Sequence, residues 1–458
     1  MQNRFTKLNW WWPVISLWLG LLLISLYLVF LRHAEFLTSG FDLGIFTQGT
    51  WLMSQTLSPN STLRGMNLFG DHFSLILLPI TPFMRIFPSA QTLLILQTVA
   101  IYLSFIPLLL FVKTKGLWSR THLILLLLIL SGNIGILSAM FFDFHPEILS
   151  LPIFSLLLYE VSSKRYKFFW ILLSILLLTK EDFGLYLSFL GLALWAGGEK
   201  QRGCRTFVIS ILSFWLIVLK IMPYFGAGLI GGGYLSKTVF GQSIPGGLEL
   251  VTWIFQPLIK VKTVLVSLGV WLFLPLMDRV TIFLIIPLIA ARFLLNDPLR
   301  WGLNLHYSGV LSLVLCWGFV NVLLNKKKIL EIFGIEKILI FTLILEVLVI
   351  AHFSPRLNVT GKRSREAHEI KSVLVVVPSN ASVSASSNLV PHLAARKEIY
   401  QFPEGIEQAE YVVLTLDRTT YPLSWDQFKL KVNELNKNPD YELQAEKGST
   451  YLFKRINR

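Results

Sequence analysis

Long apolar runs separated by short polar segments dominate the chain from its start to about residue 353. The clearest runs contain almost no charge, and they cover residues 10–31, 93–112, 122–142 and 305–324. A helix of about 20 residues crosses the ~30 Å hydrocarbon core of a membrane, and it satisfies its own backbone hydrogen-bonding groups there. Each of these runs is long enough for one crossing. The pattern therefore predicts an integral membrane protein.

Weaker apolar segments extend this pattern. We expect further crossings near residues 204–223, 262–277, 280–295 and 335–353. Residues 168–179 and 183–195 are too short for ordinary crossings, and they predict two short helices that meet at the polar sequence TKEDFG. Irregular backbone of this kind is tolerated in a membrane only inside protein or beside a wet cavity. Together the segments predict an all-α polytopic transmembrane bundle of about 11 crossings over residues 1–353.

The segment 72–88 departs from this pattern. Its apolar stretch is short and is interrupted by Pro79, Pro82 and Pro88. Proline removes a hydrogen bond from a helix interior and clashes with the preceding turn. We therefore expect a helix that lies at the outer membrane interface, and not a crossing.

The pattern changes after residue 353. Residues 354–458 mix weakly apolar runs with charged residues of both signs. The runs at 373–377, 411–416 and 450–454 predict strands, and the spacing over 424–437 predicts a helix. The sequence thus predicts two domains: a transmembrane domain over 1–353 and a small soluble α/β domain over 354–458.

Composition and charge fit this division. Hydrophobic residues make up 54% of the chain and charged residues only 15%, which argues against a soluble protein. The net charge of +14 is spread over short loops between crossings, so it indicates membrane orientation and not binding to nucleic acid. If the basic loops face the cytoplasm, the N-terminus is cytoplasmic and the C-terminal domain is extracytoplasmic. We expect a multi-pass protein of the plasma (inner) membrane.

The acidic and histidine residues then gather on the outer face. Ionisable groups are costly near hydrocarbon, so a cluster of them at one face suggests a site. Asp42 follows the turn-forming Gly40 in the sequence FDLGIFTQGTW. Two interpretations stay open: Asp42 caps a helix that lies along the interface, or it carries chemistry. The sequence FGDHFS adds Asp71 and His72 to the same face.

The sequence FFDFHPEIL adds Asp143, His145 and Glu147. Carboxylate and imidazole groups at alternate positions could hold a divalent cation or a phosphate. In the alternative interpretation, Pro146 and Glu147 simply begin a helix and complement its dipole. A divalent metal ion is the one cofactor that these residues suggest.

The sequence TKEDFG places Lys180, Glu181 and Asp182 where the two short helices meet. These charges either pair with one another or bind a ligand, and Lys180 would complement an anionic lipid phosphate. Further candidates for binding substrate at the outer face are Arg64, Arg292, Arg300, His306 and Tyr307.

Taken together, these motifs resemble a known family. Asp42 in the first outer loop, followed by GDHFSLILLP, FFDFHPEIL, LLLTKEDFGLYL and LNLHYSG, resembles a domain-of-unknown-function family of prokaryotic polytopic membrane proteins. That family is similar to the GT-C superfamily of glycosyltransferases, which use polyprenyl-phosphate sugars. The first resemblance covers nearly the whole chain. The resemblance to GT-C enzymes covers mainly the first two-thirds.

The resemblance implies a reaction and roles for three residues. Asp42 matches the acidic residue that acts as general base or positions the acceptor in GT-C enzymes, and Asp71 and His72 match positions that contact donor phosphate or a metal in some members. The chain departs from the usual pattern by carrying His72 where lysine is common, and a lone aspartate where many members have an Asp-Glu pair. The implied reaction is inverting transfer of a sugar from a polyprenyl-phosphate donor, a membrane lipid, to an extracytoplasmic acceptor.

Two other classes of function stay open. A transporter or flippase of a lipid or envelope precursor would place its polar groups near the bilayer midplane, whereas here they gather at one face. A non-catalytic membrane protein would instead bind a partner through residues 354–458.

Overall fold

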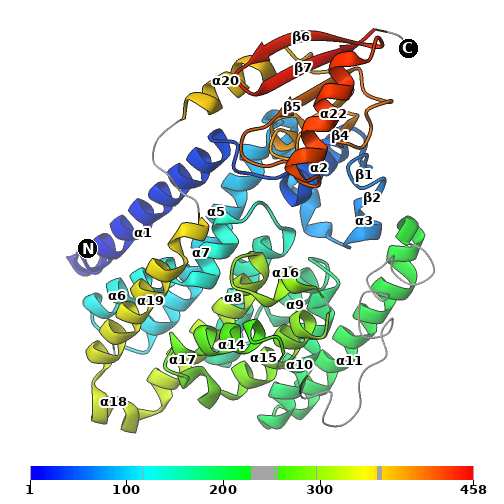
Figure 1. Cartoon of the computed structure of the whole chain (residues 1–458). Helices are drawn as coiled ribbons and strands as arrows, with labels where there is room; N and C mark the ends of the chain where they lie inside the picture. The colour runs from blue at the N-terminus through cyan, green and yellow to red at the C-terminus, as the bar shows by residue number, and fades with distance from the viewer. Residues whose placement is uncertain are drawn as a thin grey trace.

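The computed structural model describes residues 2–116, 118–227, 252, 256–295, 297–357 and 364–456. It is mostly helical, and the C-terminal part of the chain forms a small sheet-containing region at one end of the helical body (Figure 1). The structure therefore agrees with a helical bundle that carries a small C-terminal α/β region.

The helical body begins with a run of helices of very different length. They are α1 (Gln2–Ala34), α2 (Ile45–Thr56), α3 (Leu68–Asp71), α4 (Thr81–Ile86), α5 (Ala90–Thr114), α6 (Arg120–Gly132), α7 (Ile134–Phe141), α8 (Leu151–Ser163), α9 (Phe169–Leu177), α10 (Asp182–Ala196) and α11 (Lys200–Leu216). Short helical turns occur between them and after α11, at η1 (Gly40–Gly44), η2 (Leu75–Ile80), η3 (Pro146–Ser150), η4 (Ile217–Ile221) and η5 (Pro223–Ala227).

The second half of the body continues in the same way. Its helices and turns are α14 (Ile259–Gly269), η8 (Leu274–Met277), α15 (Arg279–Phe293), α16 (Pro298–Trp301), η9 (His306–Ser308), α17 (Gly309–Asn325), α18 (Lys327–Phe333) and α19 (Ile335–Leu357). α17 forms the centre of the bundle, because its residues are apolar on all sides and almost all of them are buried.

Four helices of the described residues are long and apolar enough to cross a membrane: Trp11–Ala34, Ala90–Thr114, Lys200–Gly226 and His306–Asn325. α6 and α7 together form one more candidate, bent by 49° at their junction. The expected count of about 11 crossings is not confirmed. Several apolar helices, such as the 9-residue α9 and the 15-residue α10, are shorter than a full crossing.

The segment 72–88 forms no crossing. It folds into the short helical pieces η2 and α4, with Pro79 and Pro82 at their boundary. Leu78, Phe83 and Ile86 are exposed along it, as on a helix that lies in an interface.

The C-terminal region is built on a five-stranded sheet of order β4-β3-β5-β7-β6. β3 (Val383–Ala385) lies parallel to β4 (Ile399–Gln401) and β5 (Tyr411–Thr415), while β7 (Thr450–Arg455) lies antiparallel to β5 and β6 (Tyr441–Lys447). Three helices accompany the sheet: α20 (Arg365–Leu374), α21 (Val390–Leu393) and α22 (Trp425–Lys437).

The strand predicted at 373–377 is wrong. The helix α20 extends to Leu374, and Ser364 caps its start by accepting a hydrogen bond from Ala367 N. Ile370 and Val373 are buried at helical spacing, whereas Val375 is 75% exposed. Helical packing of one apolar stripe therefore overrides the strand preference of the valine run.

The C-terminal region is joined to the end of α1 by buried polar contacts. Glu35 accepts hydrogen bonds from the Ser364 backbone and hydroxyl, and it also pairs with Arg418 at 3.0 Å. The ring of His33 stacks on the ring of His392 with centroids 3.9 Å apart. These contacts fix the sheet-containing region over the loop that follows α1.

Candidate functional site

Asp42 lies in η1, the tight turn between α1 and α2. Its backbone is held at φ 63° and ψ −82°, and such conformations cost a non-glycine residue about 1–3 kcal/mol. Ser39 caps this turn, because its side chain accepts a hydrogen bond from Phe41 N. The N-cap residue of α2 is Gly44, which has no side chain that could accept a hydrogen bond. The capping interpretation of Asp42 is therefore wrong, and another reason is needed for an aspartate here.

The electrostatic environment of Asp42 favours the protonated form. Burial, helped by the nearby Asp143, raises the pKa of Asp42 to about 7, against the opposite effects of His72 and Lys180. A carboxyl group with a pKa near neutrality exchanges protons readily at physiological pH. This is the property required of a general base.

A cavity of about 560 Å³, here called the main cavity, lies beside Asp42. Its polar lining residues are Ser39, Asp42, Arg64, Asp71, His72, His145, Asp297, Arg300, His306, Tyr307 and Tyr421. Its apolar lining residues are Phe41, Ile45, Phe46, Phe142, Leu295, Leu299 and Leu305. The structure thus brings together predicted residues from widely separated parts of the chain.

The other predicted residues lie buried behind this lining and not on it: Asp143, Glu147, Lys180, Glu181 and Asp182. Lys180 Nζ lies 3.0 Å from Glu147 Oε2 and 3.1 Å from Asp182 Oδ2. Burial opposes the charge on Lys180, but these carboxylates outweigh it and raise its pKa. Lys180 is therefore paired with two carboxylates. The geometry favours the interpretation in which these charges pair with one another.

Glu181 supports the cavity through His72. Its Oε1 lies 2.7 Å from His72 Nδ1, and its Oε2 accepts a hydrogen bond from Phe73 N at 3.1 Å. Burial lowers the pKa of His72, but the Glu181 carboxylate outweighs this effect, so the pKa is raised. His72 thus supplies positive charge to the wall of the main cavity below its raised pKa.

Asp143 organises the loop that carries Asp42. Its Oδ2 accepts a hydrogen bond from Ser39 N at 2.7 Å, and Arg32 lies 4.0 Å from its Oδ1. Burial raises the pKa of Asp143 to about 7, although Arg32 and the Ser39 amide act against the shift. Asp143 therefore helps to hold the turn that contains Asp42, through its hydrogen bond from the Ser39 backbone.

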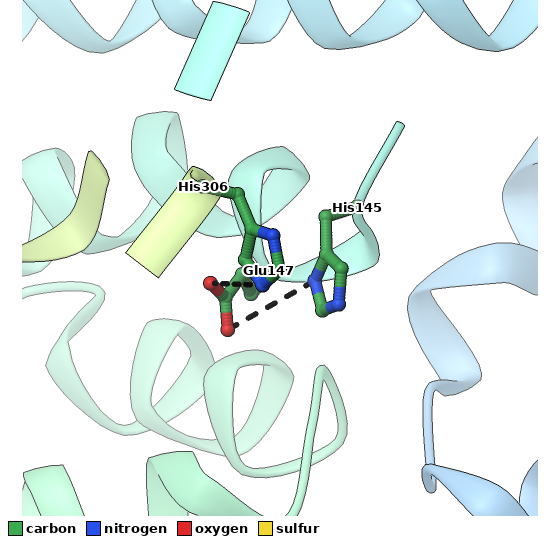
Figure 2. A group of neighbouring side chains, drawn as sticks. All are labelled: His145, Glu147 and His306. Carbon is green, nitrogen blue, oxygen red and sulfur yellow. Dashed lines mark ion pairs between the residues drawn. The ribbon is translucent and has the colours of Figure 1, made fainter. Parts of the chain in front are cut away.

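His145, Glu147 and His306 form a compact buried group (Figure 2), and its two histidines also line the main cavity. One ligand atom from each lies within 4.8 Å of the others. Glu147 Oε1 is 3.7 Å from His306 Nε2, and Glu147 Oε2 is 4.0 Å from His145 Nδ1. The two imidazole rings stack with centroids 3.7 Å apart.

This group has the donor set of a transition-metal site. His145 Nδ1 and both ring nitrogens of His306 are buried without a hydrogen-bond partner in the part of the chain that the structure describes. Burial, followed by the neighbouring His306 and Lys180, lowers the pKa of His145 well below its usual value, which favours the neutral imidazole that binds metals. Two histidines and one carboxylate are a common ligand set for catalytic Zn²⁺.

Arginines at the cavity are held in different ways. Arg64 makes a two-pronged ion pair with Asp71, with N–O distances of 2.8 and 2.5 Å. Arg300 pairs with Asp297 at 3.2 Å and lies over the ring of Tyr307. By contrast, the guanidinium of Arg292 donates to backbone oxygens of residues 300 and 302 and to Ser308, so it holds the chain around α16.

Two contributors to the site were missed in the sequence. Gln97 in α5 accepts a hydrogen bond from His145 N and donates one to Asp143 O, so it fixes the loop that presents both residues. Its signal was a lone amide inside an apolar run. Tyr421 comes from the C-terminal region and lines the main cavity, and nothing in its local sequence indicates this.

Both the sequence and the fold of the chain are similar to those of known proteins. The family model described as "Predicted membrane protein (DUF2079)" matches residues 32–448. The fold is similar to two crystal structures of ArnT from Cupriavidus metallidurans, one bound to undecaprenyl phosphate and one in the apo state. Each match has a TM-score of 0.58 and 9% identity, and covers 97% of this chain and 98% of the other. No curated protein sequence matches the chain.

Proposed function

This chain belongs to the DUF2079 family of predicted membrane proteins, and we propose that it is an integral-membrane glycosyltransferase with a polyprenyl-phosphate sugar as donor. The observation that carries the proposal is Asp42, held in a costly backbone conformation on the wall of a polar cavity. The ArnT-like fold supports it, because ArnT binds undecaprenyl phosphate in one of the similar structures.

Asp42 acts as the general base of this reaction. Its carboxylate takes the proton of an acceptor hydroxyl as that oxygen attacks the anomeric carbon of the donor sugar. The bond between the anomeric carbon and the phosphate oxygen breaks, and the phosphate leaves with the electron pair. Because attack and departure occur on opposite faces, the sugar is transferred with inversion.

Positive charge on the cavity wall stabilises the departing lipid phosphate. His72 and Arg300 both line the main cavity with Asp42. Charge-assisted hydrogen bonds to phosphate are strong, and fixed charges in a cavity of low dielectric act strongly on developing charge. Lys180 contributes indirectly, by neutralising Glu147 and Asp182 behind the wall.

A divalent metal ion fits the group of His145, Glu147 and His306. When bound there, the metal ion would supply Lewis-acid stabilisation to oxygen atoms of a ligand in the main cavity. Lys180 holds Glu147 Oε2 at 3.0 Å, which leaves Oε1 toward His306 Nε2. The proposed glycosyl transfer itself uses Asp42 and the cations on the wall of the main cavity.

In the proposed orientation, the main cavity lies on the extracytoplasmic side of the plasma (inner) membrane, and the N-terminus lies in the cytoplasm. Residues 1–353 would then form the membrane domain and residues 354–458 an extracytoplasmic one. In this arrangement the acceptor arrives from the extracytoplasmic side, and the donor lipid from the membrane.

The proposal is tested with the purified full-length protein. Binding of undecaprenyl phosphate is measured by native mass spectrometry, and transfer is measured with a set of radiolabelled polyprenyl-phosphate sugars and cell-envelope extract as acceptor source. We expect the wild-type protein to bind the lipid and consume one of the donors, and Asp42→Asn to bind the lipid without consuming it. Absence of lipid binding, or equal donor consumption by Asp42→Asn, would overturn the proposal.

A further inference from the structure

A second cavity of about 450 Å³ lies between the helical body and the C-terminal region. We call it the junction cavity. The helical body contributes the Asp42 turn and the loop between β1 (Asn60–Ser61) and β2 (Met66–Asn67), through Phe41, Thr62 and Arg64. The C-terminal region contributes Tyr400, Gln401, Glu404 and Gln408.

The walls of the junction cavity are tightly held. Thr62 Oγ1 donates a hydrogen bond to Ile399 O and accepts one from Ile399 N. Gln48 Nε2 donates to Lys397 O at 3.0 Å. A Cβ atom added to Gly40 would lie only 2.7 Å from Gln401 Oε1 and 3.0 Å from Val390 Cβ. The cavity is therefore preformed by packing, which lowers the entropy cost of binding a ligand.

The junction cavity adjoins the main cavity. Phe41, Ile45 and Arg64 line both of them. Asp42 follows Phe41 directly and lines the main cavity. A ligand seated in the junction cavity thus lies beside Phe41, the residue that directly precedes Asp42.

The two cavities differ in their basic lining residues. His72 and Arg300 line the main cavity and are not among the lining residues of the junction cavity. The cation that they share, Arg64, is paired with Asp71. The junction cavity instead presents the ring of Tyr400, the amides of Gln401 and Gln408 and the carboxylate of Glu404.

This lining suits a neutral ligand with many hydroxyl groups. Amides both donate and accept hydrogen bonds, and a carboxylate accepts them, so the set matches sugar hydroxyls. An aromatic ring adds apolar contact area. A phosphate would meet the repulsion of Glu404, and His72 and Arg300 are not among these lining side chains. The main cavity also carries Asp42, Asp71 and Asp297, so the positions of His72 and Arg300, and not net charge, favour the main cavity for the phosphate.

We propose that the junction cavity is the acceptor subsite, and that the acceptor is a neutral carbohydrate whose hydroxyl reaches Asp42 past Phe41. This inference rests on the proposed glycosyltransferase function. It adds that residues of the C-terminal region select the acceptor by hydrogen bonding to its sugar rings.

Two glutamates in one exposed turn provide a matched test. Glu404 lines the junction cavity, whereas Glu407 lies on a different surface hollow. The carbonyl oxygens of both residues accept hydrogen bonds, from Ser384 and Arg455, and these contacts do not involve their side chains. Glu404→Trp should fill the junction cavity, and Glu407→Trp should leave it open.

The variants and the wild-type protein are placed in phosphatidylcholine nanodiscs and tested by saturation-transfer NMR. The probes are chitobiose, mannobiose, mannose 6-phosphate and a dioleoylglycerol-linked glucose. We expect at least one neutral sugar to bind the wild-type protein and Glu407→Trp, and to bind Glu404→Trp about 10-fold more weakly. Binding of the lipid-linked probe alone identifies a glycolipid acceptor, and binding of a disaccharide identifies a free glycan.

Equal binding by the two tryptophan variants, preference for mannose 6-phosphate, or absence of binding by every neutral probe would overturn the inference. Undecaprenyl phosphate is measured on the same samples. We expect it to bind all three proteins equally, because the donor phosphate belongs to the main cavity. Loss of lipid binding by the wild-type protein would count against the proposed function, while the sugar measurements would still report on the junction cavity.

Discussion

His72 Nδ1 lies 2.7 Å from Glu181 Oε1, so a histidine of the interfacial segment is tied to the point where two short helices meet. The carboxylate is completely buried, and it raises the pKa of its partner. This pair connects two parts of the chain that are separated by more than a hundred residues, and it decides the charge on one wall of the main cavity.

Replacing Glu181 by glutamine should lower the pKa of His72, because the hydrogen bond remains while the negative charge is lost. A raised histidine pKa stabilises the folded protein fully below the unfolded value of about 6.5, and this contribution is lost as pH rises through the folded pKa. The stability difference between wild type and Glu181→Gln should therefore be larger at pH 5.5 than at pH 9. Thermal unfolding in detergent, with a histidine NMR titration, measures both effects.

Exposed Glu434, which pairs only with Lys431 at the surface, supplies the control. Glu434→Gln should change stability little, by about 0–1 kcal/mol, at either pH. A stability difference for Glu181→Gln that did not depend on pH would contradict the assignment of a raised pKa to His72.

Asp42→Asn should abolish transfer and yet stabilise the protein. Burial raises the pKa of Asp42 to about 7, so the folded protein holds a proton that the unfolded chain releases above its ordinary value of 3.8. Stability is therefore lost as pH rises from about 4 to 7, and the neutral asparagine avoids this loss. Unfolding measured at pH 8 should show the variant to be the more stable protein.

The same carboxyl predicts the pH dependence of the wild-type reaction. Only ionised Asp42 can accept a proton, so the rate should rise with pH and level off above about 7. Below that point it should fall by about 10-fold per pH unit. A profile of donor consumption between pH 5 and 9 tests this, and a rate that did not change below pH 6 would exclude Asp42 as the base.

Zinc should bind to the group of His145, Glu147 and His306. We expect about one equivalent of Zn²⁺ by elemental analysis of the wild-type protein after dialysis against the metal, and a large loss in His306→Ala. His368 is remote from this group in sequence and lies on α20, so His368→Ala serves as the control. Equal zinc content in all three proteins would show that the metal binds elsewhere.

The proposed orientation can be tested with the native cysteines. Cys204 is exposed at the start of α11 beside a basic cluster, while Cys316 is buried. A membrane-impermeant maleimide should label Cys204 only after the cells are permeabilised. In a Cys204→Ser background, Glu407→Cys in the C-terminal region should be labelled in intact cells. The reverse pattern would contradict the orientation.

The turn that holds Asp42 should be sensitive to small changes. Gly40→Ala would press a methyl group against Val390 Cβ at 3.0 Å and the Ser387 carbonyl oxygen at 3.1 Å. Gly20 in α1 has nothing within 4 Å of an added Cβ, so Gly20→Ala is the matched control. We expect Gly40→Ala to lower the unfolding free energy by about 1–3 kcal/mol and Gly20→Ala to leave it nearly unchanged. Limited proteolysis at the C-terminal region provides a second measurement.

The sequence was most informative where one physical effect acts alone. Apolar runs such as 93–112 and 305–324 correspond to α5 and α17, because hydrocarbon selects for length and lack of charge. The proline-rich segment 72–88 was likewise predicted to form no crossing. The total number of crossings was harder to predict, because apolar helices such as α9 are shorter than a full crossing.

It was harder to predict from the sequence which charged side chains face the main cavity. Lys180 and Arg64 both appeared as cations for substrate, but Lys180 is enclosed by two carboxylates and Arg64 is paired with Asp71. The Arg64 pair arises because the hairpin of β1 and β2 turns the chain back. Pairing within TKEDFG was one of the two predicted alternatives, whereas the contact between Lys180 and Glu147 depends on packing between segments, which no local pattern records.

The tight packing of residues 387–401 on Gly40 has a consequence for biosynthesis. The turn that presents Asp42 is synthesised early, but the residues that brace it are synthesised much later. We expect a chain interrupted before this point to insert its membrane helices and yet remain inert, since nothing would hold the carboxylate in its costly conformation. Chemistry at the membrane would thus begin only once residues 387–401 have been made and have packed on the turn.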